Sequence, residues 1–588
     1  MIPLHTARPR RPSACRWRTL LRPALAAAIA LASTALVPGL TAQQVEIAPP
    51  ATSLETSGGV VVSEDHRASA VGARVLAAGG TAVDAAIATG FALAVVHPSA
   101  GNIGGGGFMV IRFPDGATTA LDFREKAPLG AHPRIWLDAA GEYSSERHHD
   151  SHLAVGVPGT VAGFDKAHRL YGTVRWERLV EPAVTLAKEG FEVHEGLARG
   201  LRRLVEGTPH EATRAAFTRD GALLEAGDTL RQPDLAASLR RILEDRAEGF
   251  YHGETARLIV AEMERGGGLI TATDLARYRA RERAPVTGSY RGYEIISMPP
   301  PSSGGVTLVS MLNILEGFDL AGMGHNSAPY AHLLAEVMRR AFADRARYLA
   351  DPDFVDLPVH ALTAKARADS VRATIDFTRA TPSELGDLAG PPESPETTHY
   401  SVVDASGMAV SVTYTLEQGY GSGIVVPGAG FLLNNEMGDF NAAPGLTDER
   451  GLIGTPPNLA RPEQRMLSSM TPSIVARDGH LVAVVGSPGG RTIINTVLQV
   501  ILNRIDHGMS PEEAVRARRL HHQWFPDRIS VESEGVTEGT LERLRAMGHI
   551  LRVGGNQGLA HSIFIDAATG RRIGVPDARN PNSGAAGH

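Results

Sequence analysis

Apolar positions recur at helical spacing over residues 68–97, and the pattern divides this stretch into two helices. The first, ASAVGARVLA, ends at the glycine pair Gly79 and Gly80, and Thr81 is the expected N-cap of the second. The second, AVDAAIATGFALAVV, is apolar nearly all round. We therefore expect this helix to be buried on every side.

The segment GNIGGGGFMVIRF that follows is rich in glycine, which is typical of nucleotide-binding loops. Such a loop must lead into a helix, whereas Phe108, Val110 and Ile111 indicate a strand. We therefore predict a strand here and reject a nucleotide-binding loop.

Residues 151–353 are mainly helical by pattern, and we expect them to form packing scaffold. The motif PPPSSGG at 299–305 interrupts them and predicts a rigid turn. Periodicity fades over 361–396, where Pro, Ser, Thr, Asp and Glu accumulate. This composition fits both an exposed approach to a cleavage site and an ordinary surface linker.

Strand patterns begin abruptly at Thr397. THYSVV and GMAVSVTYTL predict a β-hairpin whose register brings Thr415 roughly opposite Thr397. A second hairpin, PSIVAR with HLVAVVG, leads through SPGG into the apolar helix RTIINTVLQVILNRI. Gly489 and Gly490 are therefore expected at a helix N-terminus. The stretch 441–466 between the hairpins has no periodicity, which predicts a lid or a disordered loop.

Composition narrows the class of protein. The chain has 588 residues, is 43% hydrophobic and 21% charged, and contains 64 Gly and 37 Pro, as in a loop-rich globular protein. Its net charge of -6 leaves no basic excess to neutralise phosphates. We therefore expect small molecules, and no nucleic acid, as partners.

The N-terminus has the pattern of a secretory signal peptide. Arginines are concentrated between residues 8 and 22, an apolar run follows at 24–37, and small residues lead to Ala42. The alternative, a membrane anchor, needs about 20 apolar residues, more than this run provides. We expect removal of residues 1–42, a periplasmic or secreted location, and no membrane span in the mature protein. Cys15, the only cysteine, would be lost, which excludes cysteine chemistry.

Taken alone, Thr397 and Thr398 are a β-branched pair that opens a strand. A threonine at a chain terminus is different, because its free α-amine can accept the proton of its own hydroxyl.

Several motifs together resemble the γ-glutamyltransferases, in their order and spacing. They are ETTHYSVVD at 396–404, TYTL at 413–416, LLNNEMGDF at 432–440, LSSM at 467–470 and GSPGG at 486–490. VDAAIATGFALAVVHPSAGNIGGGGFMV, LDFREKAP and SMPPPSSGGV resemble the large-subunit motifs of the same family. The resemblance covers nearly all of the chain after the signal peptide.

This resemblance implies an α+β fold, the four-layer αββα sandwich of the N-terminal-nucleophile hydrolases. It also implies a precursor that cuts itself between Glu396 and Thr397. The expected parts are a signal peptide (1–42), a large subunit (43–396) and a small catalytic subunit (397–588), the last two remaining together as a heterodimer.

The resemblance also assigns catalytic roles. Thr397 would be the nucleophile, and Thr415 would orient its hydroxyl. The backbone N–H groups of Gly489 and Gly490 would form the oxyanion hole. The plainer alternatives are a strand threonine on a solvated face and a tight turn that only glycine allows.

For the substrate, the resemblance implies γ-glutamyl amides such as glutathione as donors, and amino acids, peptides or water as acceptors. Arg124 would bind the donor's α-carboxylate with the help of Ser468 and Ser469. The ammonium would face three acidic residues: Glu417, Glu436 and Asp439. No metal or organic cofactor is expected.

Two positions depart from the pattern of some family members. Glu417 and Glu436 stand where some members have Asn and Gln, a change the family also permits. Arg450 stands in the predicted lid where some members carry a gating tyrosine, so the balance between transfer and hydrolysis is left open.

Two alternative functions remain at this stage: an amidase of the same fold that acts on another acyl group, such as a glutaryl-type side chain, and an uncleaved binding protein without catalysis. The pair His521 and His522 suggests a metal site, but helical neighbours point to different faces and no further ligand pattern accompanies them. We interpret this pair as structural.

Overall fold

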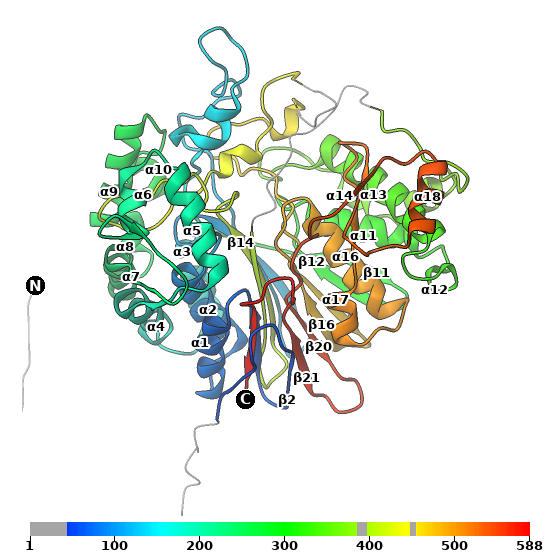
Figure 1. Cartoon of the computed structure of the whole chain (residues 1–588), viewed down its shortest axis with the longest axis horizontal. Helices are drawn as coiled ribbons and strands as arrows, with labels where there is room; N and C mark the ends of the chain where they lie inside the picture. Colours follow the sequence, from blue (N-terminus) through cyan, green and yellow to red (C-terminus); the bar gives the residue numbers. More distant parts are fainter. Residues whose placement is uncertain (1–43, 385–396, 447–453) are drawn as a thin grey trace, which may run out of the picture. The chain divides into compact units, whose positions relative to one another are not determined.

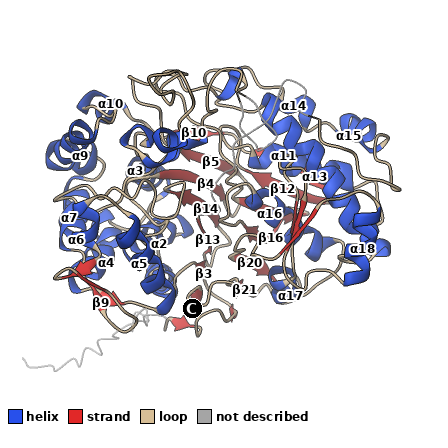
Figure 2. Cartoon of the chain, turned by 45° about the horizontal axis from the view of Figure 1, so that its top comes forward, coloured by secondary structure: helices blue, strands red, loops and turns tan. Residues whose placement is uncertain are grey.

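The computed structural model describes residues 44–384, 397–446 and 454–588. Two β-sheets lie face to face, and a layer of helices covers the outer face of each (Figures 1 and 2). This confirms the predicted αββα sandwich. The predicted signal peptide, Glu396 and Arg450 lie outside the described residues.

The first sheet has eight strands in the order β1, β22, β3, β13, β14, β4, β5 and β10, and neighbouring strands are antiparallel. Its strands are β1 (Glu46–Ile47), β22 (Gly584–Gly587), β3 (Val60–Ser63), β13 (Thr398–Val403), β14 (Ala409–Thr415), β4 (Gly106–Arg112), β5 (Thr118–Phe123) and β10 (Arg281–Arg283).

The second sheet has seven antiparallel strands in the order β11, β12, β15, β16, β20, β21 and β2. They are β11 (Val286–Tyr290), β12 (Tyr293–Ser297), β15 (Ser473–Arg477), β16 (His480–Val485), β20 (Ser562–Ile565), β21 (Arg572–Val575) and β2 (Leu54–Thr56). Smaller sheets join β6 (Phe191–Glu192) to β9 (Thr229–Leu230), β7 (Thr218–Arg219) to β8 (Ala222–Leu223), and β17 (Leu520–His521) to β18 (Ile529–Val531) and β19 (Leu551–Val553).

The central strands are apolar on both faces because both faces are covered. Successive side chains of a strand point to opposite sides. Val61 and Met109 thus pack in the core under the first helical layer, whereas Val62 and Val110 pack in the core between the sheets. The long apolar runs of β3 and β4 follow from this double burial.

The first helical layer contains the predicted pair of helices. Thr81 caps the second of them with a capping box that it forms with Asp84, and every residue of that helix is buried, as expected. The layer consists of α1 (His66–Ala77), α2 (Ala82–Val96), α3 (Thr160–Tyr171), α4 (Trp176–Glu189), α5 (Glu195–Gly207), α6 (Glu211–Ala216), α7 (Pro233–Asp245), α8 (Glu248–Tyr251), α9 (Gly253–Gly266) and α10 (Ala272–Arg277).

The second helical layer packs on the outer face of the second sheet. It consists of α11 (Gly304–Leu315), α12 (Leu320–Met323), α13 (Ala328–Tyr348), α14 (Val359–Leu362), α15 (Lys365–Arg372), α16 (Thr492–Ile505), α17 (Pro511–Arg516) and α18 (Glu538–Ala546). Short turns of helix occur at Glu146–Asp150, His152–Ala154, Glu436–Asp439 and Pro456–Asn458. Within the described ranges, no helix is both long and apolar enough to cross a membrane.

Two predictions about segments were wrong in part. The stretch 151–353 is not only helical scaffold, because β10, β11 and β12 within it extend the two main sheets. The stretch 361–396 is not irregular from its start, because α15 lies within it. These elements are three to eight residues long, too short to show a clear period.

Candidate active site

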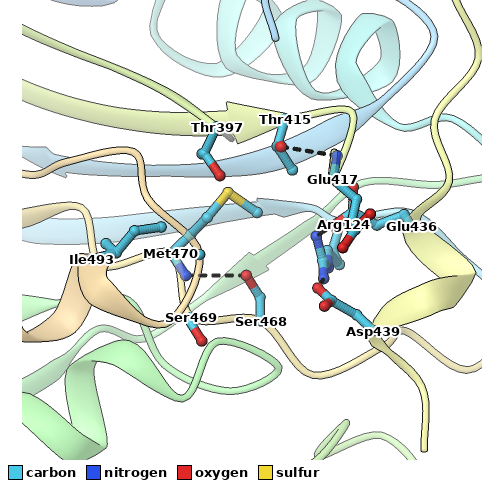
Figure 3. A pocket seen from close by; sticks show the side chains of 11 residues that line it. Arg124, Thr397, Thr415, Glu417, Glu436, Asp439, Ser468, Ser469, Met470 and Ile493 are labelled. Atoms are coloured by element: carbon cyan, nitrogen blue, oxygen red, sulfur yellow. Dashed lines mark hydrogen bonds and ion pairs between the residues drawn. The ribbon is translucent and has the colours of Figure 1, made fainter. Parts of the chain in front are cut away.

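Thr397 lies directly before β13, near the middle of the first sheet. The pairing of Thr398 with Tyr414 continues by one step to place Thr415 opposite Thr397, so the predicted hairpin and its register are confirmed. Thr397 is 7% exposed and lines a pocket that both hairpins border (Figure 3). Thr397, just before a central strand, thus presents its side chain to a small pocket.

Thr415 ends β14 and lines the same pocket. Its Oγ accepts a hydrogen bond of 2.9 Å from the backbone N–H of Glu417 (Figure 3). The alternative of a solvated strand threonine is wrong, because Thr415 is only 3% exposed. Its role in orienting the Thr397 hydroxyl stays a prediction.

Gly489 and Gly490 form the turn between β16 and α16, as predicted. Both have positive φ, +131° and +55°. A Cβ on Gly489 would stand 2.4 Å from the hydroxyl oxygen of Thr492, so the turn itself requires glycine. Gly490 also lines the pocket beside Thr397. The structural use of these glycines is therefore evident, and their role in an oxyanion hole stays a prediction.

Arg124 follows β5 and is completely buried. Its guanidinium forms ion pairs with Glu436 and Asp439, which lie on one short turn of helix (Figure 3). It also donates hydrogen bonds of 3.3 Å to the carbonyl oxygens of Met466 and Leu467. The structure thus brings the predicted carboxylate-binding arginine into direct contact with two of the predicted ammonium-binding acids.

Among the described residues that line this pocket, acidic groups outnumber basic ones. They comprise three carboxylates, those of Glu417, Glu436 and Asp439, and one guanidinium, that of Arg124. Glu125 lies just behind, with its Oε2 3.7 Å from Arg124 Nη1. Burial raises the pKa of Glu125 to about 8 and also raises the pKa of Glu436, against the attraction of Arg124. A ligand that brings its own cation would relieve this excess.

This charge excess predicts a pH effect on donor binding. With a pKa of about 8, Glu125 loses its proton as pH rises from 7 to 8.5, so negative charge near the predicted ammonium site grows. We expect the KM for a γ-glutamyl anilide to fall about threefold or more between pH 7 and 8.5, by an interaction of roughly 1 kcal/mol. In Glu125→Gln, steady-state kinetics at constant ionic strength should give a KM that stays flat. An unchanged slope in this variant would assign the effect to another group.

Ser468 and Ser469 line the pocket opposite Thr397. The Ser468 hydroxyl accepts a hydrogen bond of 3.1 Å from the backbone N–H of Met470, and the Ser469 hydroxyl accepts one of 2.8 Å from Arg345. Met470 and Ile493 complete the lining and were missed from the sequence. Met470 ends the LSSM motif and Ile493 lies in the first turn of α16, so both stand next to residues that the sequence analysis did select. Their apolar side chains are typical of core residues, which is why they were not selected.

The histidine pair that suggested a metal site in the sequence makes other contacts in the structure. His521 ends β17, not a helix as the sequence analysis assumed; it contacts Asn495 at 2.7 Å, and His522 contacts Asp527 at 3.1 Å. The structural interpretation of this pair fits these contacts.

A second group, His332, Glu336 and His549, is compact enough to hold an ion. The Glu336 carboxylate already pairs with Arg339 and Arg340 at 2.5 and 2.6 Å. These two guanidinium groups would repel a metal cation at the same place. We therefore assign no metal to this group.

These observations define the class of protein: the chain has the αββα sandwich of an N-terminal-nucleophile hydrolase, with a threonine at the start of a central strand. Within that class, the family described as Gamma-glutamyltranspeptidase matches residues 68–587, and the chain belongs to this family of acyltransferases and hydrolases.

Similar proteins agree with this placement. The chain is 49% identical over 535 residues to a glutathione hydrolase proenzyme of Escherichia coli (strain K12), covering 90% of this chain and 92% of the relative. It is 39% identical over 500 residues to an acylase ACY 1 proenzyme of Pseudomonas sp. (strain SE83), covering 84% and 87%. A solved cephalosporin acylase from Bacillus halodurans superposes with a TM-score of 0.80 at 26% identity, covering 91% of this chain and 97% of that one.

Proposed function

We propose that this chain removes the γ-glutamyl group from glutathione and other γ-glutamyl amides and transfers it to an amino acid, a peptide or water. The observation that carries the proposal is the pairing of Arg124 with Glu436 and Asp439 in the pocket of Thr397. A glutamyl donor ends in a carboxylate beside an ammonium. A guanidinium that sits next to carboxylates is complementary to both charges.

Maturation and catalysis would use the same hydroxyl. In maturation, Thr397 Oγ attacks the carbonyl of Glu396, and an ester replaces the peptide bond, which frees the Thr397 amine. Water then hydrolyses this ester, which releases the Glu396 carboxylate and restores the Thr397 hydroxyl. In catalysis, this amine accepts the hydroxyl proton while Oγ attacks the γ-carbonyl of the donor. The N–H groups of Gly489 and Gly490 stabilise the oxyanion, and the proton passes to the departing amine. The acceptor then releases the γ-glutamyl group from the ester.

The strand order supports lasting association of the two fragments. In the first sheet, β13 and β14 of the 397–588 fragment lie between β3 and β4 of the 43–396 fragment. In the second sheet, four strands of the smaller fragment lie between β12 and β2 of the larger one. A cut before Thr397 would leave all these pairings in place, as a heterodimer requires. We also propose that residues 1–42 direct export to the periplasm or beyond, which a mature N-terminus at residue 43 in exported protein would support.

Two donors distinguish this function from that of an acylase. γ-Glutamyl anilide and glutaryl anilide are identical except that the glutaryl compound lacks the ammonium. We expect kcat/KM for the γ-glutamyl compound to be at least about a hundredfold higher, because the glutaryl compound leaves the acidic side of the pocket without its cation. Release of aniline by the purified protein measures both. Equal or better use of the glutaryl compound would favour the acylase function, which the names of two relatives suggest for those proteins.

A further inference from the structure

The rigid turn at 299–305 contacts the segment that carries the pocket serines. The backbone N–H of Ser303 donates to the carbonyl oxygen of Ser468 at 2.7 Å. The backbone N–H of Ser468 donates to the carbonyl oxygen of Pro301 at 3.0 Å. The hydroxyl of Ser303 donates to the same Ser468 oxygen at 2.6 Å. The turn that the sequence predicted thus fixes the backbone beside Ser468 and Ser469.

Arg345 connects this turn to the pocket. It lies near the end of α13 in the second helical layer and is only 3% exposed. Its Nε donates to the hydroxyl oxygen of Ser303 at 2.9 Å, and its Nη2 donates to the hydroxyl oxygen of Ser469 at 2.8 Å. One guanidinium therefore holds one hydroxyl of the turn and one hydroxyl of the pocket wall.

The chemistry of these contacts fixes the direction of the hydroxyls. A guanidinium has only donors, so both serine oxygens must accept from Arg345. The O–H of Ser303 accordingly points to the carbonyl of Ser468. The O–H of Ser469 must likewise point away from Arg345, as a donor. The Ser468 oxygen accepts from the backbone N–H of Met470, so its O–H must point away from that N–H, also as a donor. Donors on this wall are what an anionic group in the pocket requires.

We propose that Arg345 is a positioning residue for donor binding, which acts through Ser469 and Ser303 and turns the pocket hydroxyls toward the donor's α-carboxylate. This inference rests on the proposed function, because it assumes a donor with that carboxylate. Arg345 does not itself line the pocket. It stabilises the bound donor in the ground state and the transition state alike, so its loss changes KM and leaves kcat nearly unaffected.

The test compares Arg345→Met with the matched control Arg347→Met, which removes the same side chain from an exposed position on the same helix. We expect Arg345→Met to raise the KM for γ-glutamyl anilide about tenfold and to change kcat less than about twofold, the size expected for a lost hydrogen bond from a charged donor. Arg345→Lys, which keeps the charge but not the two-pronged geometry, should recover part of the loss. Arg347→Met should match the unmodified chain.

A double-mutant cycle with Ser469→Ala separates positioning from general damage. If Arg345 acts through Ser469, the combined variant should have nearly the KM of the worse single variant. Multiplied effects, a loss in kcat alone, or an unchanged KM in Arg345→Met would each overturn the proposal. If Arg345→Met does not fold and cleave itself, Ser303→Ala is the deciding variant, because it removes one partner hydroxyl and keeps the buried charge. We expect its KM to rise about threefold. An unchanged KM in Ser303→Ala would overturn the proposal. If the unmodified chain does not cleave γ-glutamyl anilide at all, the proposed function has failed instead.

Discussion

Thr397→Ala is expected to remain a single uncut chain with no measurable release of aniline from γ-glutamyl anilide. Both the cut and the turnover depend on one hydroxyl, so its removal should lower kcat by at least about 10⁴-fold, as removal of a nucleophile does in other hydrolases. A denaturing gel and the masses of the fragments report the cut, and the anilide assay reports the turnover. Thr397→Ser, which keeps the hydroxyl, should retain slow cleavage.

The neighbouring threonine supplies a control for the Thr397 prediction. The Thr398 hydroxyl is buried and has no hydrogen-bond partner within the described residues, so Thr398→Val should keep both the cut and most of the activity. Normal processing of Thr397→Ala would refute the assignment of the nucleophile. An unmodified chain that folds but runs as one full-length band would instead favour a binding protein without catalysis.

Arg124→Met is expected to raise the KM for γ-glutamyl donors by at least about a hundredfold and to leave self-cleavage intact. The variant loses the guanidinium to which the proposed function assigns the α-carboxylate, and it removes this cation from beside Glu436 and Asp439. Truncating one partner of a buried, hydrogen-bonded charge pair in a complex costs about 2–5 kcal/mol, which corresponds to a loss of roughly 30-fold to several-thousand-fold in affinity. Steady-state kinetics measures the KM, and the gel that shows two fragments serves as the control for folding.

Arg124→Lys refines this prediction. It keeps one positive charge beside the two acids but cannot bind a carboxylate through two parallel hydrogen bonds. Its KM should lie between those of the unmodified chain and Arg124→Met. If both variants bind the donor as well as the unmodified chain does, Arg124 does not recognise the carboxylate, and the excess of acidic groups around it has another purpose.

The sequence pattern predicted those parts of the site that depend on residues close together in the chain. The register that sets Thr415 opposite Thr397 follows from a period of two and a tight turn, and Gly489 and Gly490 follow from the change from strand to helix. The four layers were implied by the family resemblance and not by the pattern, since buried strands and buried helices are similarly apolar.

Contacts between distant residues had no local signal. Arg345 lies 124 residues from Ser469 in the chain, and Arg124 lies 312 residues from Glu436. An arginine on a helix such as α13 is by default a solvated residue, and only the packing of that helix against the LSSM segment makes it part of the site. Glu125 was likewise hidden, because its burial behind Arg124 depends on how β5 meets the rest of the fold.

The interleaved strands also determine the order in which folding and the proposed cleavage occur. Because β13 is flanked by β3 on one side and by β14 and β4 on the other, its place exists only once distant parts of one continuous chain have come together. The proposed cut before Thr397 would therefore be a late step, made after this sheet has formed. After the proposed cut, both fragments would still contribute strands to both sheets, so neither could leave without breaking strand pairings.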